Sequence, residues 1–105
     1  VAAMRAQPEQ ASVQELGCGA LRNMAMGDVA SKRAIVEARG LEAVVAAMQV
    51  HTSHSTVHEN SGAVICNVAV GGATCKRAII NAGAVEAVVT SMQAHPTLTS
   101  VQQLG

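Results

Sequence analysis

The spacing of apolar and polar residues predicts a chain built of helices. Residues 42–49, EAVVAAMQ, are good helix formers whose apolar positions share a face, and residues 31–38, SKRAIVEA, place apolar side chains opposite charged ones. The longest helical pattern covers residues 13–26. Its expected apolar face consists of Val13, Leu16, Ala20, Leu21 and Met24. No segment alternates apolar and polar residues as a half-buried strand would.

Start and stop signals recur along the chain at one spacing. Residues 12–15 (SVQE), 56–59 (TVHE) and 100–103 (SVQQ) each match a capping box, in which a Ser or Thr oxygen accepts a first-turn N–H and a later Glu or Gln reaches back. We expect the long helix to begin there. The stop signals are Gly27 and Gly71 after the long helix, Gly40 and Gly83 between the short and middle helices, and Pro8 and Pro96 after the middle helix.

The whole chain repeats itself every 44 residues. Shifted by that distance, residues 13–61 lie on residues 57–105 without a gap, and 18 of the 49 positions are identical. A period of about 40 to 47 residues is typical of helical solenoids. Each period then holds a short, a middle and a long helix.

Four short motifs resemble those of the armadillo-repeat family. They are IVEARG (35–40), IINAG (79–83), ALRNMA (20–25) and VICNVA (64–69), in the order and spacing of that family. The resemblance implies an all-α fold, a right-handed α-solenoid of three-helix armadillo repeats with about two and a third repeats. Residues 1–105 would form one array: 1–27 the end of one repeat, 28–71 a complete repeat and 72–105 an incomplete one. Arg39 replaces the turn glycine of the family, which would move the flexible position to Gly40.

The resemblance also implies a peptide-binding groove lined by the long helices. Asn23 and Asn67 match the asparagine that binds the backbone of an extended peptide in armadillo proteins. An amide side chain offers both a donor and an acceptor, so it can pair with a peptide unit. The structural alternative is that each asparagine ties neighbouring helices together or caps the long helix.

Other residues would shape that groove. Glu15, Leu16, Glu59 and Asn60 lie one to two turns earlier and predict a mildly acidic, shallow floor, which Arg22 and Cys66 flank as positions that differ between repeats. Nuclear-import members of the family often carry a Trp one turn before the asparagine, where this chain has Gly19 and Ala63. The resemblance therefore does not extend to the binding of basic localisation peptides.

Composition excludes several classes of function. The chain has 105 residues, seven basic and seven acidic residues, and no Trp, Tyr or Phe, so it lacks both a positive field and stacking platforms for nucleic acid. No apolar run approaches the roughly 18 residues of a membrane span. Three cysteines without a CxxC spacing favour a reducing, intracellular location, cytoplasmic or nuclear, and small apolar packing roles without a disulfide.

No cofactor, metal site or catalytic centre is expected. His51, His54 and His58 form a local cluster beside Glu59, but only the first histidine recurs 44 residues later, so a solvated loop is favoured over a zinc site. Cys66 has no histidine within helical reach, and a reactive role for Cys75 at a helix start is the weaker alternative. Lys32-Arg33 and Lys76-Arg77 are interpreted as a solvated outer face.

The sequence thus predicts a non-catalytic scaffold that binds a partner protein or an extended peptide. The alternatives are purely structural spacer repeats within a larger assembly, and regulatory repeats beside a catalytic domain outside this chain. Uncapped ends would also permit head-to-tail self-association, because repeat arrays normally end in polar caps. The apolar residues expected at the two ends are Val1, Met4 and Leu16 on one side and Val89, Met92 and Leu98 on the other.

Overall fold

The computed structural model describes residues 1–95, which form seven α-helices and no strand. The helices are α1 (Ala2–Ala6), α2 (Ala11–Ala25), α3 (Val29–Glu37), α4 (Gly40–Val50), α5 (Ser55–Ala69), α6 (Ala73–Asn81) and α7 (Ala84–Ala94). The all-α prediction is confirmed. The bounds of α2 and α5, of α3 and α6, and of α4 and α7 each differ by 44 residues, so the sequence period is also a period of the helices.

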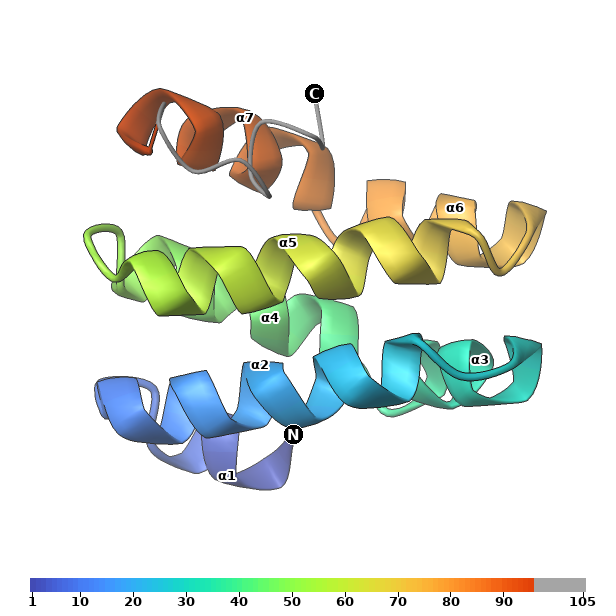
Figure 1. Cartoon of the computed structure of the whole chain (residues 1–105), viewed down its shortest axis with the longest axis horizontal. Coiled ribbons are helices and arrows are strands. Elements are labelled where there is room, and N and C mark those ends of the chain that lie inside the picture. The colour runs from blue at the N-terminus through green and yellow to red at the C-terminus, as the bar shows by residue number, and fades with distance from the viewer. Residues whose placement is uncertain (96–105) are drawn as a thin grey trace.

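Equivalent helices lie beside one another (Figure 1). The long helices α2 and α5 form one row, and they share the most extensive contact between any two helices of residues 1–95. The helices α1, α4 and α7 form a second row that packs against the long helices, while α3 and α6 pack together at the C-terminal ends of α2 and α5. This arrangement presents the outer surfaces of α2 and α5 side by side.

The core is centred on α4, which contacts helices of both rows. Leu41, Val44 and Met48 are buried there together with Ala43 and Ala47, so α4 has apolar side chains on more than one face. Because no aromatic residue is available, small side chains must fill the interior, and they allow the helices to pack closely.

The buried face of α2 differs from the predicted one. Leu21 is buried as expected, but Leu16 is 76% exposed and Met24 is also exposed, whereas Gln14 and Cys18 are buried. The reason lies in the neighbours of α2. In α5, the residues equivalent to Ala20 and Met24 are buried, because that side of α5 packs against α2. No helix of residues 1–95 covers the same side of α2.

The capping boxes at residues 12–15 and 56–59 do not form. Helix α2 begins at Ala11 and α5 at Ser55, and neither has a side-chain cap. The backbone N–H groups of Gln10 and His54 bond to the carbonyl groups three residues earlier, and these turns lead the chain into each helix before the predicted start. The third box, at 100–103, lies outside the described residues, as do Pro96 and Leu98.

Sequence reasoning missed one cap and misplaced one turn. Asp28 caps α3, with its Oδ1 accepting the Ser31 N–H at 2.9 Å, and this hydrogen bond lowers the pKa of the Asp28 carboxyl. The left-handed residue before α4 is Arg39, with φ of 61°, and not Gly40, which is buried as the first residue of α4. Arg39 and Gly83 are 44 residues apart and share this conformation, since the φ of Gly83 is 76°.

Two further expectations are wrong for single residues. Lys32 is not part of a solvated face, because its ammonium group is buried and donates to the carbonyl oxygens of Ala25 and Gly27 at 2.8 and 2.7 Å. Met4 is not an exposed end residue, because it is only 3% exposed. Gly17 leaves the space that the Met4 side chain occupies, since a Cβ at Gly17 would collide with it.

Candidate functional site

A shallow hollow lies on the outer surface of α2, at its border with α5. Four of the six predicted site residues line it: Glu15, Arg22, Asn23 and Asn60. The remaining wall consists of Leu16, Gly19, Ala20 and Met26. Because Gly19 has no side chain, the middle of the hollow is open, and a Cβ there would meet only Asn60 Nδ2, at 3.6 Å.

Two polar contacts join the edge of this hollow to the neighbouring helix. Arg22 Nη1 donates to Asn60 Oδ1 at 3.1 Å, and Glu15 Oε1 lies 3.2 Å from His54 Nε2. The first pair links α2 to α5, and the second links α2 to the residue that precedes α5. Arg22, Glu15 and Asn60 therefore contact residues across the border between the two long helices as well as lining the hollow.

Asn23 and Asn67 occupy equivalent positions on α2 and α5 and make no such link. Asn23 is exposed and Asn67 is half-buried, and within residues 1–95 neither amide forms a side-chain hydrogen bond. The interpretation of these residues as ties between neighbouring helices is therefore not supported in the described part of the chain. Both amides remain available to a ligand.

The other predicted groove residues lie on α5. Glu59 is half-buried and Cys66 is exposed, and neither belongs to the hollow on α2. The three cysteines are free thiols, of which Cys18 and Cys75 are buried. Burial raises the pKa of the Cys18 thiol, which lies 3.3 Å from Ser61 Oγ in the contact between α2 and α5. This pair fills the helix interface.

Sequence reasoning missed a set of contacts made by histidines between successive repeats. His51 Nε2 lies 2.8 Å from the carbonyl oxygen of Pro8, and His95 Nε2 lies 2.7 Å from that of Thr52. Both the histidines and the carbonyl groups are 44 residues apart. The recurrence of His51 as His95 is visible in the sequence, and it is the pattern from which these contacts could have been predicted.

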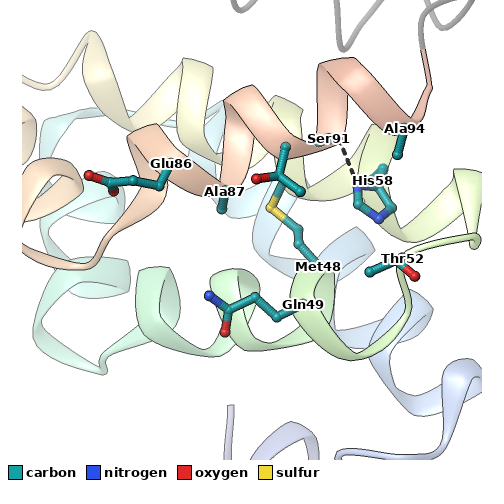
Figure 2. A pocket seen from close by; sticks show the side chains of 9 residues that line it. Met48, Gln49, Thr52, His58, Glu86, Ala87, Ser91 and Ala94 are labelled. Atoms are coloured by element: carbon teal, nitrogen blue, oxygen red, sulfur yellow. Dashed lines mark hydrogen bonds between the residues drawn. The ribbon is translucent and has the colours of Figure 1, made fainter.

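His58 is buried between α4 and α7 and is not a loop residue (Figure 2). Its Nε2 lies 3.1 Å from the His51 carbonyl oxygen, and its Nδ1 lies 2.6 Å from Ser91 Oγ. A carbonyl oxygen only accepts, so Nε2 carries the proton of the neutral ring and Nδ1 accepts from the serine hydroxyl. Burial and the nearby His95 ring lower the pKa of His58. The histidine thus couples the middle helices.

Two kinds of feature are absent from residues 1–95. No helix there has the length and apolar character needed to cross a bilayer, and no three His, Cys, Asp or Glu side chains there are grouped closely enough to hold a metal ion.

Comparison with known proteins adds no family to this description. No protein-family model, no curated protein and no solved structure matches the chain.

Proposed function

We propose that the chain is a non-catalytic, armadillo-type scaffold whose long helices α2 and α5 bind an extended segment of a partner protein. The observation that carries this proposal is the pair Asn23 and Asn67. They are equivalent residues on adjacent long helices, and their amides have no partner within residues 1–95.

The contrast with the interior supports this function. Every buried side-chain nitrogen and oxygen among the described residues has a hydrogen-bond partner. The chain therefore satisfies polar groups wherever packing requires it, and it leaves two equivalent amides open on one surface. Each amide offers a donor and an acceptor, which match the C=O and N–H of one peptide unit.

The spacing of the helices suits an extended ligand. Packed helix axes are about 8–10 Å apart, and an extended chain advances about 3.3 Å per residue. Asn23 and Asn67 would then engage peptide units about three residues apart. A ligand held in this way is recognised mainly through its backbone, so its side chains must provide selectivity through the surrounding hollow.

The experiment is a selection from a displayed library of random peptides of about twelve residues on the immobilised chain. Enriched peptides are synthesised, and their affinities are measured for the wild type and for Asn23→Ala and Asn67→Ala. A hydrogen bond of this kind contributes about 0.5–1.5 kcal/mol, so each variant should bind about two- to thirteenfold more weakly.

Asn81→Ala is the matched control, because Asn81 is an exposed asparagine on α6, away from the long-helix surface. It should bind the selected peptides as the wild type does. Equal affinity of all four proteins would contradict the groove. A lower melting temperature of Asn23→Ala and Asn67→Ala, with unchanged affinity per folded molecule, would instead assign the asparagines a structural role and favour the spacer alternative.

A further inference from the structure

We infer that the hollow on α2 selects an extended segment in which an aliphatic side chain lies next to a carboxylate. This inference rests on the proposed function, because it names the class of peptide that the same groove would take.

The aliphatic preference follows from the walls of the hollow. Leu16 and Met26 are 76% and 67% exposed, and they line the hollow together with Gly19 and Ala20. A ligand side chain seated there would cover apolar surface that is now in water, which favours binding. Because the chain has no Trp, Tyr or Phe, the hollow offers no cation–π site for the charged group of a ligand lysine or arginine.

The preference for a carboxylate follows from the charges at the edge of the hollow. Arg22 is exposed, and its partner is the neutral amide of Asn60. A guanidinium has five N–H donors, so most of those of Arg22 remain free within residues 1–95. Glu15, the acidic residue of the hollow, faces His54 instead. Within residues 1–95, Arg22 forms no ion pair with a carboxylate, and Glu15 lies seven residues away, about 10 Å along the axis of α2.

The two preferences are placed close together by the helix. Gly19 and Arg22 are three residues apart, so they lie on neighbouring turns, about 4.5 Å apart along the axis. An extended ligand that crosses α2 would place the aliphatic side chain over Gly19 and a carboxylate one or two residues away on the guanidinium. The equivalent residues of α5 are Ala63 and Cys66, so this selectivity belongs to α2.

The test compares peptide selections on the wild type and two variants. Arg22→Gln removes the charge and keeps a donor, while Gly19→Leu fills the hollow. The leucine Cβ has space, because only Asn60 Nδ2 lies within contact distance. Arg33→Gln on α3 is the control, since it removes an exposed arginine that does not line the hollow.

Wild-type selections should be enriched in sequences with a Leu, Ile or Val within two positions of an Asp or Glu. We expect Arg22→Gln to bind these peptides about threefold to tenfold more weakly, as for a charge-assisted contact at an exposed site. Their affinity for the wild type should fall as NaCl rises from about 50 to about 500 mM, and that dependence should be smaller for Arg22→Gln. Gly19→Leu should lose the aliphatic preference.

The possible outcomes distinguish a failure of this inference from a failure of the proposed peptide-binding function. If no peptide is enriched over an empty support, the peptide-binding function itself fails. If peptides are enriched and need Asn23, but are basic or lack acidic residues, the groove stands and this inference is overturned. Equal binding of the selected peptides by Arg22→Gln and Arg33→Gln would overturn it as well.

Discussion

Two junctions between successive repeats contain equivalent residues, and one equivalent pair, Gln14 and His58, differs in its chemistry. At the first junction, Gln14 of α2 donates to the carbonyl oxygens of Met4 and Gln7 at 2.9 and 3.0 Å. At the second junction, the equivalent residue of α5 is His58, whose Nε2 lies 3.1 Å from the carbonyl oxygen of His51. Gln7 and His51 are themselves equivalent, so both side chains satisfy the same backbone carbonyl.

The space beside the two side chains is also repeated. A hollow of about 230 Å³ lies between α1 and α4 next to Gln14, and one of about 220 Å³ lies between α4 and α7 next to His58 (Figure 2). Small side chains on the middle helices line both hollows, so the hollow is present at both junctions. The difference between the junctions is therefore chemical: an amide does not titrate near neutral pH, whereas an imidazole does.

The largest expected difference between the junctions comes from their apolar contacts. Leu41 of α4 and Val85 of α7 are equivalent residues, but Leu41 is 1% exposed and Val85 is 51% exposed. Leu41→Ala should lower the free energy of unfolding by about 2–5 kcal/mol because it leaves a cavity. Val85→Ala should change it by about 0.5 kcal/mol or less, as at other surface sites. Urea denaturation of both variants measures this difference.

The urea dependence of the unfolding free energy should be the same in both variants, because neither change alters the surface exposed on unfolding very much. A similar loss of stability in both variants would show that α7 is covered as fully as α4. The two junctions would then be equivalent in packing as well as in their polar contacts.

The comparison also shows what the sequence could predict. Helices, their order and their period of 44 residues follow from apolar spacing and from self-similarity, which depend on local preference and on repetition. The location of Arg22, Asn23 and Asn60 at one hollow follows from the same spacing. Their use as a binding site remains a prediction.

The inward position of Gln14, His58 and Lys32 could not be derived from apolar spacing. Each is polar, and each is buried because its side chain bonds to carbonyl groups that the fold brings near. Those acceptors belong to turns and helix ends, whose positions depend on tertiary structure. For the same reason, an apolar residue such as Leu16 is exposed when no neighbouring helix covers its side of the helix.

Acid should weaken the second junction more than the first. The folded protein holds the pKa of His58 below its ordinary value of about 6.5, so the neutral ring is favoured in the folded state. The stabilisation is complete above the unfolded pKa, and it is lost as the pH falls from there through the lower folded-state pKa. The unfolding free energy of the wild type should therefore fall as the pH drops below about 6.5, by at most about 1.4 kcal/mol per pH unit for one proton.

His58→Gln places the glutamine of the first junction at the second, and it should reduce the dependence of the unfolding free energy on pH. Gln14→His is the reciprocal variant and should increase it. The ionisable groups around His58 are His95, with ring centroids 4.5 Å apart, His51 in the connection after α4, and Glu86 on α7 at the edge of the hollow. Residues 96–105 carry no ionisable side chain. Equal pH dependence of the wild type and His58→Gln would assign the effect to the other histidines.

The smallest expected effect concerns the turn that leads into the two middle helices. Arg39 and Gly83 both adopt left-handed backbone angles, with φ of 61° and 76°. For a residue with a side chain, this conformation costs about 1–2 kcal/mol, whereas glycine adopts it freely but loses more entropy on folding. Arg39→Gly should therefore raise the unfolding free energy by about 1 kcal/mol or less, and Gly83→Arg should lower it by about 1 kcal/mol. The Arg39 side chain is exposed and forms no hydrogen bond within residues 1–95, so its removal should lose little else. If Arg39→Gly is clearly destabilising in the same urea titration, the arginine contributes a contact that offsets the backbone cost. The two turns would then be alike in geometry but not in what stabilises them.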